Sequence, residues 1–192
     1  SSHKFSSGSH TEGRIAGKAA IKYITEKGAD PSVDMGKVEE LKKKILAPLD
    51  VFVASKDKYT DPEVNTDYIM PRQFLFRLQK IMDEYVGGVT SRFKTSNKLL
   101  ERALELMVYL KEDSDKQAAR DLHELTRAWE NIQRMWIAES HIRTILFREE
   151  TRWPGYYFRA ATPNMDDENW LCFANCRWDP NSGEWETMKR DI

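Results

Sequence analysis

The chain has 192 residues, and its 30 Lys and Arg against 31 Asp and Glu leave a formal net charge of −1. This balance argues against a dedicated nucleic-acid binder, because such proteins concentrate unpaired basic residues on one surface. Hydrophobic residues make up 40%, which is typical of a globular protein, and no apolar run approaches the roughly 20 residues of a membrane span. Two cysteines are too few for a disulfide framework, so we expect a reducing compartment, the cytoplasm.

The first segment, residues 1–9, is a Ser/Gly-rich loop with the sequence SSHKFSSGS. The sequence starts at Ser1, without an initiator Met, inside a loop whose composition predicts a binding function. We therefore expect the chain to be a fragment of a longer subunit. Ser9 and Glu12 have the spacing of a capping box, which predicts that a helix starts here. Gly28 is suited to end that helix after Lys27.

One face of this predicted helix is almost without side chains. Gly13, Ala16, Gly17 and Ala20 follow each other at helical spacing, which lets another backbone or a flat group approach closely. Two interpretations stay open: tight packing of the helix on a sheet, or a position beside a bound cofactor.

The middle of the chain predicts an antiparallel helical bundle. A helix starts at Pro71, suited to a first helical position, and closes at Gly87 and Gly88. Apolar periodicity predicts three further helices, the first of them bent or ended by Pro48, and a loop separates it from the helix at Pro71. The predicted ranges are 38–49 for the first helix, 55–68 for the loop, and 96–112 and about 115–150 for the last two helices.

The remainder, 151–192, is broken by prolines and rich in aromatic residues. Residues 170–178 alternate as a strand does, a turn follows at 179–183, and 184–189 can return as a second strand. Cys172 and Cys176 lack a second pair of ligands for zinc. We therefore interpret them as reduced core thiols and expect no metal site.

The amino-terminal loop is the candidate binding site. A loop that leads into a capped helix presents free backbone N–H groups and the positive end of the helix dipole, which suits an anion. His3 and Lys4 add positive charge, and Phe5 offers an aromatic face. The chemistry of these residues predicts an anionic ligand.

The segment SSHKFSSGSHTEGRIAGKAA resembles the last flavin-contacting loop and helix of the succinate dehydrogenase/fumarate reductase flavoprotein superfamily. The resemblance implies a substrate site at His3, Lys4 and Phe5, with the main catalytic residues upstream of the fragment. It also implies that FAD is contacted by Ser6, Ser7, Gly8, Ser9 and His10. At the far end Arg148-Glu-Glu-Thr-Arg152, then Arg159, Pro163, Asp167 and Trp170, is similar to the carboxy-terminal signature of the superfamily, which we interpret as an ion-paired scaffold.

The segments HKFSSGS, ARDLHELTRAWEN and ETRWPGYYFRA, followed by DDENW, are similar to one branch, the alpha subunits of dissimilatory adenylylsulfate reductases. That implies an FAD enzyme that reduces adenosine 5′-phosphosulfate to AMP and sulfite, or catalyses the reverse. Electrons would come from an iron–sulfur beta subunit with two [4Fe–4S] clusters. The fragment alone is expected to be inactive. Ala161 stands where the branch usually has Asp, which puts a local ion pair with Arg159 in doubt.

The expected fold is mainly α. Residues 1–28 would end an FAD-binding α/β domain, 29–150 form a helical domain, and 151–192 form an irregular segment with a β-hairpin. One alternative is a dicarboxylate oxidoreductase of the same superfamily, although Lys4 replaces the Arg that would clamp a carboxylate. The other is a non-catalytic helical module that docks a partner subunit.

Overall fold

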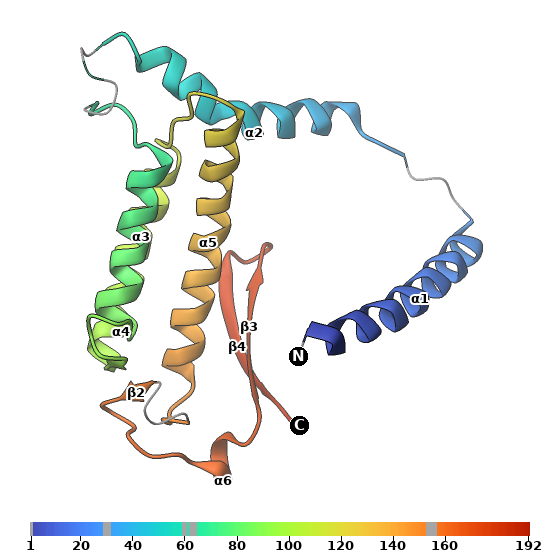
Figure 1. Ribbon diagram of the computed structural model, residues 1–192, viewed down its shortest axis with the longest axis vertical. Helices are drawn as coiled ribbons and strands as arrows, with labels where there is room; N and C mark the ends of the chain where they lie inside the picture. The colour runs from blue at the N-terminus through green and yellow to red at the C-terminus, as the bar shows by residue number, and fades with distance from the viewer. Residues whose placement is uncertain (1, 29–31, 59–60, 62–64, 153–156) are drawn as a thin grey trace. The chain divides into compact units, whose positions relative to one another are not determined.

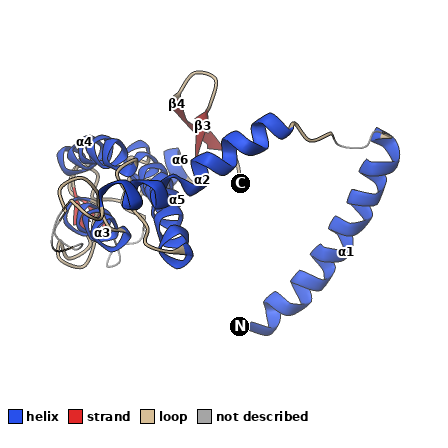
Figure 2. Ribbon diagram, turned by 90° about the horizontal axis from the view of Figure 1, so that it is seen from above, coloured by secondary structure: helices blue, strands red, loops and turns tan. Residues whose placement is uncertain are grey.

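The computed structural model describes residues 2–28, 32–58, 61, 65–152 and 157–192. The chain forms two compact units, one ending at Leu41 and the other beginning at Lys42. Helices make up most of the described chain, as predicted, and a small antiparallel hairpin lies near its end (Figures 1 and 2). The elements are α1 Ser2–Lys27, α2 Met35–Ser55, α3 Pro71–Tyr85, β1 Lys94–Thr95, α4 Asn97–Ser114, α5 Leu122–Phe147, β2 Phe158–Arg159, α6 Asp167–Trp170, β3 Phe173–Asp179 and β4 Glu184–Arg190.

Helix α1 is longer than predicted. It begins at Ser2, so the expected loop at residues 1–9 and the helix start at Ser9 are wrong. No proline interrupts this stretch, and the side chains from Ser9 to Lys27 are exposed, so local propensity rather than packing decides the backbone. The predicted end is confirmed: Gly28 has φ +59° and donates its N–H to the carbonyl of Ile24 at 3.1 Å.

Helix α2 continues past Pro48, which was predicted to bend or end it. A proline removes one helical hydrogen bond. Here the helix is held on either side by other parts of the chain, because the Trp129 indole donates to the carbonyl of Ile45 at 2.9 Å and the Ala119 N–H donates to that of Pro48 at 2.8 Å. These tertiary contacts stabilise the helical conformation on both sides of Pro48.

Helices α3, α4 and α5 lie side by side and enclose the main core (Figure 1). Helix α3 starts at Pro71 and ends before Gly87, whose φ of +92° favours glycine, as predicted. The apolar pattern of α4 predicts a buried face of Leu99, Ala103, Leu106, Met107 and Leu110. Ala103, Met107 and Leu110 are buried as predicted, but Leu100 is buried in place of Leu99, which is 37% exposed. The least exposed side chains of this core are Phe74, Leu100, Ala103, Met107 and Ile142.

Helix α5 begins at Leu122, later than the predicted 115. Residues 116–118 instead pair with Ile69, whose N–H donates to the carbonyl of Lys116 at 2.9 Å and whose carbonyl accepts from Ala118 at 3.0 Å. The helix then starts where the Asp121 carboxylate accepts from the N–H of Glu124 at 2.9 Å.

The predicted hairpin is present as strands β3 and β4, which pair antiparallel and place Trp178 opposite Trp185. The hairpin packs along α5 (Figure 1), where the Trp136 ring centroid lies 5.1 Å from that of Trp178. The predicted strand started too early, because Trp170 belongs to α6 and Cys172 precedes β3. Both cysteines are free thiols and are half-buried rather than in the core.

Candidate functional sites

All eight predicted substrate-binding and cofactor-binding residues lie in the amino-terminal turns of α1. They are His3, Lys4, Phe5, Ser6, Ser7, Gly8, Ser9 and His10. In a continuous helix the N–H groups of Ser9 and His10 point to carbonyls four residues earlier. They are therefore not free to bind an anion, which corrects the expected helix amino end at Ser9. The side chains of Ser9 and His10 are exposed.

The small-residue face of α1 is open. Outside its own turns of the helix, a Cβ atom added at Gly13 or Gly17 on this face would meet no atom of the described chain within 4 Å. The same is true of Gly8, which lies on the opposite side of the helix. The small-residue face can accept a flat cofactor or another backbone at close range. The open face fits the expected close approach of a flavin. The helical amino end does not fit the expected contact between an anionic group and free backbone N–H groups.

The carboxy-terminal signature forms an ion-paired group that we call the Glu150 cluster: Arg148, Glu150, Arg152 and Asp167. The Glu150 side chain is fully buried and lies 2.9 Å from Arg148 Nε and 2.6 Å from Arg152 Nε. Arg152 also pairs with Asp167 at 2.9 Å. Burial alone would raise the pKa of Glu150, but hydrogen bonds from Arg152 and from the backbone N–H of Asp166, with the charges of both arginines, hold that pKa below its usual value.

The Glu150 cluster ties the end of α5 to the segment before the hairpin. Arg148 donates to the carbonyls of Trp170 at 2.6 Å and Cys172 at 3.2 Å. Such charge-assisted bonds to backbone carbonyls, in addition to the bond from the Cys172 N–H to the Trp170 carbonyl at 2.8 Å, fix the irregular chain between α6 and β3. The interpretation of the signature as an ion-paired scaffold is confirmed for Arg148, Glu150, Arg152 and Asp167.

Arg159, a further member of the signature, is also buried, with 1% of its surface exposed. The parallel pairing of β1 with β2 places it opposite Thr95, close to the start of α4. Its guanidinium donates to the carbonyls of Ile145 at 2.7 Å and Arg148, and to Asn97 Oδ1 at 2.5 Å. Ala161 is exposed. The two side chains therefore lie in different environments.

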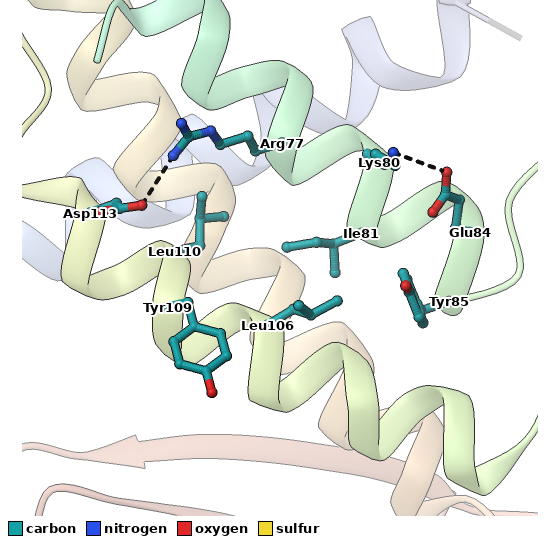
Figure 3. Close-up of a pocket in the computed structure, with 9 residues that line it drawn as sticks. All are labelled: Arg77, Lys80, Ile81, Glu84, Tyr85, Leu106, Tyr109, Leu110 and Asp113. Carbon is teal, nitrogen blue, oxygen red and sulfur yellow. Dashed lines mark hydrogen bonds and ion pairs between the residues drawn. The ribbon is translucent and has the colours of Figure 1, made fainter. Parts of the chain in front are cut away.

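A groove of about 340 Å³ lies between α3 and α4 (Figure 3). Its floor is apolar, and its rim charges are paired, Arg77 with Asp113 at 3.0 Å and Lys80 with Glu84 at 3.7 Å. Because these rim charges are paired and the floor is apolar, the groove does not resemble a catalytic site. In the part of the chain that the structure describes, no group of three or more His, Cys, Asp or Glu could hold a metal ion.

The sequence did not single out Tyr157 or Asn97, which lie against Arg159. Asn97 is 62 residues away from Arg159 in sequence and carries no motif. Tyr157 belongs to the aromatic segment ETRWPGYYFRA, on which the resemblance partly rests. The sequence did not, however, predict a contact between Tyr157 and Arg159.

Residues 76–192 match the family described as fumarate reductase flavoprotein C-term. The matched region contains α4, α5, the Glu150 cluster and the hairpin, so the chain belongs to this family of flavoprotein carboxy-terminal domains. In the residues that the structure describes, no helix is long and apolar enough to cross a membrane.

Within that family the similarity is high to one kind of enzyme. The chain is 47% identical over 191 residues to the adenylylsulfate reductase subunit alpha of Megalodesulfovibrio gigas, covering 99% of this chain and 28% of that protein. It is 53% identical to the adenylylsulfate reductase structure from Archaeoglobus fulgidus, with a TM-score of 0.88 over 95% of this chain and 28% of that one. A structure described as adenosine-5-phosphosulfate reductase with a covalent sulfite adduct gives the same values.

A more distant structure shows only the shared fold. The E. coli quinol fumarate reductase flavoprotein is 16% identical, with a TM-score of 0.67 over 94% of this chain and 28% of that one. The chain thus spans about a quarter of the length of each of these relatives.

Proposed function

We propose that the chain is part of the FAD-containing alpha subunit of an enzyme that reduces adenosine 5′-phosphosulfate to AMP and sulfite, or catalyses the reverse, in dissimilatory sulfur metabolism. The observation that supports this is the identity of 47% over 191 residues to a subunit of that name. The dicarboxylate alternative is supported only by a likeness at 16% identity, which concerns the fold.

In the full-length subunit, FAD would lie against the amino end and the small-residue face of α1. The open positions at Gly8, Gly13 and Gly17 support this placement. Ser6 to His10 would contact the cofactor, and His3, Lys4 and Phe5 the substrate. FAD supplies two-electron redox chemistry when bound. Because the N–H groups of Ser9 and His10 are used within the helix, the proposal requires the first turns of α1 to unwind around the cofactor.

The proposed partner is an iron–sulfur beta subunit that carries two [4Fe–4S] clusters and supplies electrons, and the proposed location is the cytoplasm. The similarity to reductase alpha subunits supports the partner, because a subunit named alpha implies another subunit. The free thiols of Cys172 and Cys176 support a reducing compartment.

The decisive experiment uses the full-length subunit co-expressed with the iron–sulfur subunit. Reduction of an electron acceptor by sulfite is measured with and without AMP, and succinate is tested in parallel. We expect activity only with sulfite and AMP together. Activity with succinate would instead select the dicarboxylate alternative, and no activity with either would favour the docking module.

Lys4→Ala in the same complex tests the substrate site. Loss of one charged contact to the phosphosulfate is expected to lower kcat/KM by about tenfold or more, while FAD content stays unchanged. Lys18→Ala removes the same charge from an exposed position of α1 and serves as the matched control. Unchanged kinetics in Lys4→Ala would remove Lys4 from the site.

A further inference from the structure

A long groove follows the line between α3 and α5. It consists of two adjoining hollows of about 600 and 720 Å³, which share Leu75 from α3 and Arg134 from α5. Helix α4 packs against both helices (Figure 1) but lines neither hollow, so the hollows lie on a side of the helix pair that α4 leaves open. We call this surface the α3–α5 groove. It follows α5 from His123 to His141, which is about 27 Å at the helical rise of about 1.5 Å per residue.

The half of the α3–α5 groove near the amino ends of the two helices is basic. Its wall carries four guanidinium groups and one imidazole, those of Arg72, Arg120, Arg127, Arg134 and His123. Arg120 pairs with Glu124 at 2.9 Å. Arg127 and Arg134, in contrast, share one carboxylate, that of Glu130, at 2.9 and 3.0 Å. Arg72 lies over the uncharged ring of Phe76, 5.3 Å from its centroid. Asp121 lies at this end too, but its carboxylate caps α5. This half therefore carries an excess of positive charge, to which the amino end of α3 adds.

The other half of the α3–α5 groove is mainly apolar and open to solvent. Its apolar lining consists of Leu75, Leu78, Met82, Val89, Ile137 and Ala138. Val89 and Ile137 are 74% and 68% exposed. The Asp83 carboxylate in this half is bound within the chain, because it accepts from the Thr90 N–H at 3.1 Å. Large exposed apolar side chains that gather beside a charged rim are typical of a protein-binding surface.

The spacing of the arginines favours a helix as the occupant. Arg127 and Arg134 are seven residues apart on α5, so their Cα atoms are separated by about 10.5 Å along the helix axis, which is too far for one small anion to bridge directly. Side chains seven residues apart on a second helix repeat at the same distance, so two carboxylates of such a helix can reach both guanidinium groups. Arginine is enriched in interfaces between separate proteins, whereas permanently covered faces are more apolar.

We propose that the α3–α5 groove binds an amphipathic helix of a separate partner protein. Its acidic residues would face Arg72, Arg127 and Arg134, and its apolar residues would pack on Ile137 and its neighbours. With α4 on the other side of the pair, the incoming helix would complete a four-helix bundle. The groove shares no residue with α1, so this inference does not depend on the proposed function.

The probe is a fluorescent synthetic peptide of about 18 residues, the helical length that spans the groove. It carries Glu residues seven apart in one half and a stripe of Leu in the other. The peptide is titrated with the full-length complex and followed by fluorescence anisotropy. We expect saturable binding of one peptide per alpha chain, weakened by salt because the charges of the basic half contribute.

Charge reversal on α5 tests the basic half. Arg127→Glu together with Arg134→Glu should weaken binding of the Glu peptide about tenfold or more. A peptide with Lys in place of Glu should then bind this double variant more tightly than the wild type, a result that misfolding cannot produce. Lys98→Glu together with Arg102→Glu makes the same change of charge at exposed positions of α4 and should leave binding unchanged.

Ile137→Gln tests the apolar half without changing the charge. The side chain is exposed, so the substitution should leave the fold intact, while the peptide should bind severalfold more weakly. Hydroxyl-radical footprinting of the full-length complex should show Val89 and Ile137 oxidised without the peptide and protected with it.

Three results would overturn the proposal. One is protection of Val89 and Ile137 before the peptide is added, which would mean that another part of the full-length complex covers the groove. Another is a change of oligomeric state in the α5 double variant, measured by sedimentation, which would make a second copy the occupant. The third is equal binding of the Glu peptide to the wild type and to the α5 double variant, which would place the peptide elsewhere.

Discussion

Glu150 combines full side-chain burial with two arginine partners, and both arginines keep about a fifth of their side-chain surface exposed. Glu150→Gln removes the charge and leaves two guanidinium groups facing a neutral amide. Breaking a buried ion pair in this way costs about 3 kcal/mol of unfolding free energy. Urea unfolding of the full-length subunit measures the loss. Glu105→Gln, which breaks an exposed pair with Arg102, is the control and should change little. Equal effects of the two substitutions would contradict the importance of burial.

The same residue predicts how stability depends on pH. Because the pKa of Glu150 is lower in the folded chain than the roughly 4.3 of an unfolded Glu, its contribution is present above that value. The contribution is lost as pH falls through the folded pKa. The difference in unfolding free energy between wild type and Glu150→Gln should therefore be largest near neutral pH and shrink in acid. A difference that stays constant from neutral to acidic pH would exclude this linkage.

At the scale of single residues, the sequence predicted the members of the signature but not how they are used. Asp167 lies 15 residues from Arg152 and is brought to it by the fold. Arg148 and Arg152 each lie two residues from Glu150, so their pairing with it follows from charge and spacing. The surroundings of Arg159 do not, because the pairing of β1 with β2 brings it to Asn97 across the fold. Long-range pairing of two-residue strands leaves no periodic signal.

The elements show the same division between local and long-range causes. Helix α3 was predicted with its ends because Pro71 and Gly87 act within one turn of the helix. The start of α5 was predicted too early, although Asp121 and Glu124 have the spacing of a helix cap. The break itself is made by Ile69, about 50 residues earlier, which pairs with residues 116–118. Such a partner cannot be found in the local sequence.

The hairpin of β3 and β4 is held to α5 chiefly by three tryptophan rings. Trp136, Trp178 and Trp185 have ring centroids 5.1 to 5.9 Å apart, and the Lys111 ammonium lies 4.8 Å from the Trp136 ring. Trp178→Ala should cost about 2 kcal/mol or more, because aromatic truncation leaves a cavity at a half-buried site. Hydrogen exchange should show faster opening of the hairpin with α4 unchanged.

Phe173→Ala is the matched control for that prediction. Phe173 lies on the same hairpin but is 58% exposed, so its truncation should leave exchange in β4 close to that of the wild type. If both substitutions open the hairpin equally, the tryptophan contact is not what holds it.

For the molecule as a whole, the two units differ in what holds them. The unit that begins at Lys42 has its own core, ion-paired scaffold and docked hairpin. The described α1 shows exposed apolar side chains, with Ile15, Ile21 and Ile24 each more than 60% exposed. Burying one such side chain is worth about 1.5–3 kcal/mol. Together with the open glycine face, this supports the proposal that α1 packs against the flavin-binding part of a full-length subunit.

Gly17→Leu tests that arrangement. Within this chain the added side chain meets no atom at the Cβ position and replaces a poor helix former, so α1 itself should not be harmed. In the full-length subunit the same side chain would prevent the close approach of FAD or of a neighbouring backbone. We expect flavin content, measured by absorbance of the purified complex, to fall severalfold, while the exchange protection of α3 to α5 stays as in the wild type. Lys18→Leu adds an apolar side chain at the next position, on another face, and should retain FAD. Full flavin content in Gly17→Leu would mean that this face of α1 does not contact the cofactor or its supporting backbone.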